Sequence, residues 1–129
     1  MSVIKILIAD DHAMIRDGVR YLLQDEVDIE LIGEAVDGQD ALEKIGELKP
    51  DVAIIDVNMP KMNGLELIAR LREDNLEVRT MVFSIHDEEE YMLKSIKFGA
   101  HGYMLKDVDR DEFLKGIRII AEGGRFFGK

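Results

Sequence analysis

Cysteine and tryptophan are absent from the 129 residues, and proline occurs only twice. Without cysteine the chain has no disulfide and no thiolate metal ligand, which fits a reducing compartment. No apolar run approaches the roughly 20 residues that cross a bilayer. The short apolar run near the start leads into charged residues instead of a small-residue cleavage site, unlike a secretory signal. We therefore expect a cytoplasmic protein that makes no membrane contact.

Basic residues are also scarce. The sequence has 17 Lys and Arg against 27 Asp and Glu, a formal net charge of −10. Such a surface repels nucleic acid, so any DNA contact needs another segment or partner to supply positive charge. Hydrophobic residues make up 47% of the chain, which is enough for one core, and the length fits a single domain over residues 1–129.

Short apolar runs alternate with stripes of apolar residues at helical spacing, such as Leu67, Ile68 and Leu71. Asp87 is expected to cap the fourth helix, with Glu90 completing a capping box. The pattern predicts a doubly wound α/β fold, in which a parallel sheet of five strands is flanked by five helices. The expected strands are Val3–Ala9, Ile29–Val36, Val52–Ile55, Val78–Phe83 and Tyr103–Leu105.

Polar side chains stand where four of these strands end. Asp10 and Asp11 follow the first strand, Asp56 the third, Ser84 the fourth and Lys106 the fifth. The carboxyl ends of parallel strands share one edge of a sheet, so these groups are expected to converge there. Carboxylates this close need a compensating cation, and oxygen ligands without cysteine favour Mg²⁺. We expect the Asp10–Asp11 pair to hold this ion.

The remaining groups suggest phosphoryl transfer. A carboxylate can attack phosphorus and form an aspartyl phosphate, and Asp56 stands alone at the end of the third strand. Catalysis of this step is mostly positioning and charge stabilisation. Lys106 and the Ser84 hydroxyl are suited to contact the phosphoryl oxygens. Asp56 is therefore the predicted nucleophile.

Four segments together resemble the receiver domain of bacterial two-component response regulators, over essentially the whole chain. They are the acidic pair, "DVNMPKMNG" from Asp56 to Gly64, Ser84 after an apolar strand, and "GAHGYMLK" ending in Lys106. Each is weak alone, but their order and their places at strand ends are specific. The resemblance implies a flavodoxin-like fold with strand order 2-1-3-4-5.

The resemblance also implies residue roles. Asp56 would take phosphate from the phosphohistidine of a sensor histidine kinase or from a small phosphodonor. Asp11, Asp56 and the backbone carbonyl of Asn58 would bind Mg²⁺ directly, and Asp10 would act mostly through a bound water. Lys106 would contact the acyl phosphate. The domain would promote its own phosphorylation and dephosphorylation without being a multiple-turnover enzyme.

Switching residues are implied in the same way. Ser84 would move to bond the phosphate, and Tyr103 would rotate inward with it. Asn58 and His86, two residues beyond Asp56 and Ser84, are expected to modulate dephosphorylation.

Within this family, the stretches "ADDHAMIRDG" and "GAHGYMLK" look most like those of regulators that carry a LuxR/NarL-type helix-turn-helix. The implied function is a transcriptional switch that forms a homodimer on phosphorylation and meets DNA through a C-terminal domain. The sequence ends at Lys129 with no basic recognition helix. We expect either a receiver cut from a longer regulator or a stand-alone regulator.

Other readings of these residues exist. Asp10 or Asp11 would serve equally as a cap of the first helix, and His12 is expected to begin that helix without a chemical role. In a Mg²⁺-dependent phosphatase of the haloacid dehalogenase type, the nucleophile ends the first strand and a second Asp stands two positions later. Here the residue two positions after Asp10 is His12. A pseudo-receiver normally lacks an acidic residue or the lysine. A flavin site needs a phosphate-cradling loop after the first strand, which the acidic pair replaces.

Overall fold

Within residues 3–127, the part of the chain that the structure describes, six strands and five helices alternate in this computed structural model. All strand pairs are parallel, in the order β2-β1-β3-β4-β5-β6. The strands are β1 (Ile4–Ala9), β2 (Ile29–Ala35), β3 (Val52–Asp56), β4 (Arg79–Ser84), β5 (Gly102–Leu105) and β6 (Phe126–Phe127). The helices are α1 (Ala13–Leu23), α2 (Gly38–Leu48), α3 (Gly64–Glu73), α4 (Glu89–Phe98) and α5 (Arg110–Ala121). The predicted doubly wound order 2-1-3-4-5 is confirmed.

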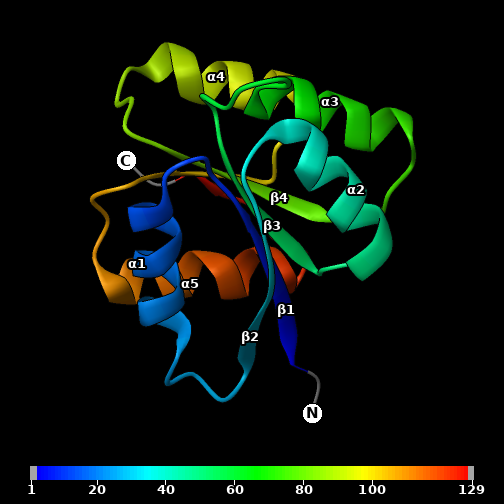
Figure 1. Cartoon of the computed structure of the whole chain (residues 1–129). Coiled ribbons are helices and arrows are strands. Elements are labelled where there is room, and N and C mark those ends of the chain that lie inside the picture. The colour runs from blue at the N-terminus through cyan, green and yellow to red at the C-terminus, as the bar shows by residue number, and fades with distance from the viewer. Residues whose placement is uncertain (1–2, 128–129) are drawn as a thin grey trace.

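Helices cover both faces of the sheet. Figure 1 shows α1 and α5 on one face and α2, α3 and α4 on the other. Successive side chains of a strand point to opposite faces, so β1 serves two cores. Ile6 and Ile8 belong to the cluster packed under α1 and α5, whereas Leu7 and Ala9 belong to the cluster under α2 to α4. Burial of β1 on both faces explains why its sequence is a nearly unbroken apolar run.

Three helices begin at a capping side chain. Asp37, Asn63 and Asp109 precede α2, α3 and α5, and each accepts a hydrogen bond from the backbone N–H three residues later. At α3 the Glu66 side chain also accepts from the Asn63 backbone, which completes a capping box. The loops that leave the carboxyl edge of the sheet are therefore anchored at their far ends.

Two glycines let backbone segments approach closely beside the end of β3. A Cβ added to Gly64 would meet the carbonyl oxygen of Asp56, and one added to Gly38 would meet that of Met62, both well inside van der Waals contact. Neither position holds a positive φ, so space and not backbone conformation requires the glycine. The β3–α3 loop is thus packed backbone to backbone on two sides.

Two details differ from the prediction. A sixth strand, β6, adds to the edge beyond β5; it is only two residues long and carries no periodic signal. The Asp87 capping box is wrong: α4 begins after Glu88, which makes no side-chain capping bond. The β4–α4 loop is held instead at His86, whose backbone N–H donates to the Ser84 hydroxyl and whose carbonyl oxygen accepts from the Tyr103 hydroxyl, so the helix starts later. Separately, no helix within residues 3–127 has the length and apolar character needed to cross a bilayer.

Candidate functional site

One ammonium group joins two carboxylates at the carboxyl edge of the sheet. Lys106 Nζ lies 2.8 Å from Asp10 Oδ2 and 3.3 Å from Asp56 Oδ1. All three side chains are nearly buried, with exposed fractions of 9% for Lys106, 0% for Asp10 and 5% for Asp56. β1 and β3 are direct neighbours, which brings Asp10 and Asp56 together, and β5 delivers the lysine from two strands away. Three residues about 50 positions apart in sequence thus form one buried cluster.

The surroundings of Asp56 disfavour its ionised form. Burial raises the pKa of Asp56 above its usual range, the charge of Asp10 adds to the rise, and Lys106 opposes it. Its Oδ2 atom is buried and has no hydrogen-bond partner among residues 3–127. A buried carboxylate oxygen without a partner is unfavourable unless a cation or an electrophile engages it.

The acidic cluster fits a cation. One ligand atom from each of Asp10, Asp11, His12 and Asp56 lies within 4.8 Å of the other three. Carboxylate oxygens predominate, as hard divalent ions prefer, and the free Asp56 Oδ2 is available as a ligand. Lys106 alone leaves an excess of negative charge, so the residues present suit a bound Mg²⁺.

The other predicted residues gather around His86 and not around the carboxylates. The Ser84 hydroxyl accepts the His86 backbone N–H at 3.0 Å, and the Tyr103 hydroxyl donates to the His86 carbonyl oxygen. The Asn58 side-chain amide lies 3.0 Å from His86 Nε2. Burial raises the pKa of the Tyr103 phenol, so it stays protonated as a donor near neutral pH. Tyr103 is 3% exposed, so its side chain is buried in this structure.

Three residues that contact the site were not predicted from the sequence to do so. His12 was expected to have no chemical role, yet its ring lies against the acidic pair, with Nδ1 2.9 Å from Asp10 Oδ1. Arg16 donates from Nη1 to the Asp10 backbone carbonyl at 2.6 Å and holds the end of β1. Tyr91 stacks on the His86 ring, with centroids 4.1 Å apart and planes 10° apart. Only His12 carried a signal, because it directly follows the acidic pair.

The first helix is capped by neither aspartate. His12 is the residue before α1, and the side chain of Asp10 accepts the His12 backbone N–H at 2.9 Å. Asp10 therefore supports the turn into the helix without being its N-cap. The bond to the His12 backbone uses only Oδ1 of Asp10, so it does not occupy Oδ2, the oxygen that faces Lys106.

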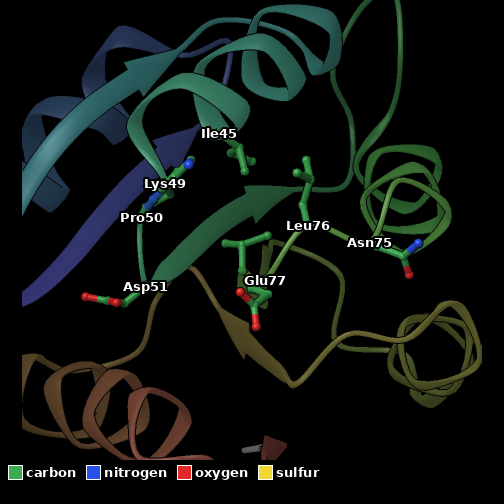
Figure 2. Close-up of a pocket in the computed structure, with 8 residues that line it drawn as sticks. Ile45, Lys49, Pro50, Asp51, Asn75, Leu76 and Glu77 are labelled. Carbon is green, nitrogen blue, oxygen red and sulfur yellow. The ribbon is translucent and has the colours of Figure 1, made fainter.

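Two surface hollows are large enough to raise the question of a rival site. One of about 370 Å³ borders the cluster and is lined by Ile85, Asp87, Leu105, Lys106 and Asp107. The other, of about 400 Å³, lies at the opposite edge of the sheet (Figure 2), where β3 and β4 begin. It contains none of the strand-end groups; its lining residues are Ile45, Lys49, Pro50, Asp51, Asn75, Leu76, Glu77 and Val78. The chemistry is thus concentrated at the carboxyl edge.

Comparisons with known proteins agree with this geometry. The family model of the response regulator receiver domain matches residues 6–118. The nitrate/nitrite response regulator protein NarL of Escherichia coli (strain K12) is 43% identical over 118 residues, which are 92% of this chain and 55% of NarL. The transcriptional regulatory protein DegU of Brevibacillus brevis is 39% identical over 123 residues, 95% of this chain and 52% of DegU. The chain spans about half the length of these curated relatives.

Solved structures give the same result. A signal receiver domain described as that of a NarL response regulator from Mycobacterium tuberculosis superposes with a TM-score of 0.92 at 36% identity, covering 95% of this chain and 99% of that one. A LuxR-family two-component response regulator from Aurantimonas sp. SI85-9A1 gives a TM-score of 0.91 at 30% identity, covering 97% and 89%.

Proposed function

The chain belongs to the response regulator receiver family, the phosphoacceptor signalling domain of two-component systems, and we propose that Asp56 is the side chain that accepts the phosphoryl group. The observation that carries this assignment is the buried, partnerless Oδ2 of Asp56 beside the shared ammonium of Lys106. An oxygen that lacks a partner and is held next to a fixed positive charge is poised to engage an electrophile.

The proposed step follows from these contacts. An Asp56 oxygen attacks the phosphorus of a phosphohistidine, and the O–P bond forms as the P–N bond breaks. The electron pair of the broken bond leaves with the histidine nitrogen, which takes a proton from water. Lys106 offsets the negative charge that spreads over the phosphoryl oxygens in the transition state. Asp56 must be ionised to attack phosphorus. Burial raises its pKa and disfavours the ionised form, whereas Lys106 favours it.

Mg²⁺ would be held by Asp11, Asp56 and the backbone carbonyl of Asn58, with Asp10 acting through a bound water. When bound, the ion neutralises the excess carboxylate charge and one phosphoryl oxygen. Lys106 and Asp10 are already paired, which keeps Asp10 oriented toward the cluster. Arg16 fixes the Asp10 backbone from the other side.

Ser84 and Tyr103 are the proposed switch. The Ser84 hydroxyl now accepts the His86 N–H, and a phosphate on Asp56 would compete for that hydroxyl. Loss of this bond would release the His86 segment, to which Tyr103 is also bonded. The change would be transmitted to α4, β5 and α5 as a shift between two existing states.

Asn58 and His86 are proposed modulators of the phosphoryl lifetime. Their mutual hydrogen bond and the stacking of His86 on Tyr91 hold these two polar side chains together, and Asn58 is only two residues beyond Asp56, which supports this role. They would control how water reaches the aspartyl phosphate, and the domain would in this way regulate its own dephosphorylation as well as its phosphorylation.

The partners follow from the family and from the named relatives. Response regulators of this family work with histidine kinases, and we propose a sensor histidine kinase as the phosphodonor and a homodimer as the phosphorylated state. DegU is described as a transcriptional regulatory protein, and both relatives are about twice as long as this chain. We propose that the output is regulation of transcription through a C-terminal helix-turn-helix domain.

Acetyl phosphate with Mg²⁺, followed by intact-mass analysis, tests the assignment. We expect a gain of one phosphoryl group in the wild type and none in Asp56→Asn. Asp51→Asn is the matched control, since it alters a carboxylate at the opposite edge of the sheet, and it should be labelled like the wild type. A gain that persists in Asp56→Asn would refute the assignment.

A further inference from the structure

The ring of His12 faces the acidic cluster and not the helix that it precedes. His12 occupies the N-cap position of α1, but its side chain makes no capping bond. Its Nδ1 instead lies 2.9 Å from Asp10 Oδ1 and 3.1 Å from Asp11 Oδ1. Lys106 pairs with the other oxygen of Asp10, so the ring and the ammonium approach that carboxylate from different sides. The imidazole is thus a neighbour of both aspartates of the pair.

Four ligand atoms are near enough to share one ion. Those of Asp10, Asp11, His12 and Asp56 lie within 4.8 Å of one another. Two ligands on opposite sides of an ion with bonds of ~2.1 Å lie ~4.2 Å apart, so small side-chain movements close the site. The second, independent sign of a missing partner is the Oδ2 of Asp56, which is buried and without a hydrogen bond among residues 3–127.

An imidazole changes the class of metal that such a site prefers. Mg²⁺ is bound by oxygen and keeps its waters, whereas a nitrogen ligand suits Ni²⁺, Cu²⁺ and Zn²⁺. We propose that His12 adds a nitrogen ligand to the three aspartates and that the cluster therefore also takes a divalent transition-metal ion. The inference rests on the proposed cation site, and it assigns to His12 a selectivity that Mg²⁺ binding does not need. In the structure Nδ1 faces two carboxylate oxygens and is therefore the protonated nitrogen, so binding a metal through Nδ1 releases that proton. The ring is 62% exposed, so Nε2 can carry the remaining proton in contact with solvent.

The alternative role for His12 is that of a hydrogen-bond donor that merely positions the two carboxylates. A donor role is preserved by an amide side chain, whereas a nitrogen ligand is not. His12→Gln and His12→Ala therefore separate the two roles, and the exposed N-cap position makes both variants compatible with folding. His101→Asn is the matched control, because it removes a histidine that lies at the opposite edge of the sheet, before β5.

The test uses the whole chain with one equivalent of Cu²⁺ and electron paramagnetic resonance, which detects coupling to an imidazole nitrogen. We expect the nitrogen coupling in the wild type and in His101→Asn, and its loss in both His12 variants. Calorimetric titration with Ni²⁺ should show an affinity loss of about tenfold or more in His12→Gln. Mg²⁺ affinity should change by less than about twofold, because Mg²⁺ does not need the nitrogen.

Nitrogen coupling that survives in His12→Ala would overturn the proposal, as would equal losses of Ni²⁺ and Mg²⁺ affinity in that variant. Retention of Ni²⁺ affinity by His12→Gln would assign the ring to the donor role and refute the ligand role. Failure of the proposed function looks different. In that case the wild type gains no phosphoryl group from acetyl phosphate with Mg²⁺, whatever Cu²⁺ shows.

Discussion

Acidification from pH 7 to pH 5 should destabilise this protein through one partly buried histidine, His101. Its Nδ1 accepts the backbone N–H of Thr80 at 3.0 Å, so the ring must be neutral at that nitrogen. Burial, together with the smaller effect of the positive charges of Arg79, Arg125 and Arg72, lowers the pKa of His101 from 6.5 to about 4. Protonation would cost both the accepted hydrogen bond and a fourth positive charge among three arginines.

The direction and the size of this stability change follow from the linkage between proton binding and folding. The folded-state pKa lies below the unfolded value, so the unfolded chain takes up the proton first. Stability is therefore lost as the pH falls from the unfolded pKa of 6.5 toward the folded value of about 4, and the loss levels off below that. The whole shift would correspond to about 3 kcal/mol, of which about 2 kcal/mol accrues by pH 5. Water screens the partly exposed ring, so we expect about 1 kcal/mol between pH 7 and pH 5.

Urea unfolding at pH 7, 6 and 5 measures this loss, with His101→Asn as the comparison. The asparagine side-chain oxygen can still accept the Thr80 N–H, but it does not titrate. All other titrating groups are common to both proteins, so they cancel in the difference. We expect the wild type to lose about 1 kcal/mol more than His101→Asn. Equal losses in the two proteins would refute the reasoning.

Three other substitutions test packing and charge. Gly64→Ala should destabilise the fold by about 2 kcal/mol or more in urea unfolding, because its Cβ would displace the Asp56 carbonyl, and it should also slow labelling by acetyl phosphate. Gly46→Ala, inside α2 with open space around it, should instead stabilise by about 0.5–1 kcal/mol. Arg118→Ala removes two 2.9 Å hydrogen bonds to Asp28 and one of 2.7 Å to Glu26, and should lower stability by about 1 kcal/mol at low salt.

Each of these has a control and a refuting result. Gly46→Ala is the control for Gly64→Ala, and equal effects of the two would contradict the proposed clash. Lys115→Ala, also on α5, removes an exposed charge that makes no ion pair within residues 3–127 and should be nearly neutral. Arg118 holds the pKa of Asp28 below its usual value of 3.8, so the cost of Arg118→Ala should begin to shrink as the pH falls below that value and should continue to fall as Asp28 becomes protonated in the folded protein. A cost that is unchanged at low pH or at high salt would contradict the ion-pair origin.

The sequence predicts the fold well because the sheet is buried on both faces. The inner strands β1 and β3 are then short apolar runs, whereas the edge strand β2 also carries Glu30 and Glu34, and the helices carry apolar stripes. β6 could not be predicted, since two residues have no period and pair only because β5 presents a free edge. The start of α4 could not be predicted either, because it depends on the hydrogen bond from the His86 N–H to Ser84 and on the one that Tyr103, 17 residues away, donates to the His86 carbonyl.

The convergence of Asp10, Asp56 and Lys106 was predictable from their places at strand ends in a parallel sheet. The position of His12 was not, because the direction of its ring depends on the turn into α1, where a side chain ordinarily caps the helix. The roles assigned to the site residues stay predictions until the labelling and metal experiments are done.

The two glycines beside the end of β3 place a limit on how this sequence can diverge. Gly38 and Gly64 touch no functional atom, yet each leaves room for the backbone of the β3–α3 loop. A larger residue at either position would change neither the surface charge nor any reactive group, yet it would displace the backbone at or after Asp56. Directed-evolution libraries built on this domain would therefore reveal both positions as intolerant, although neither bears any reactive group.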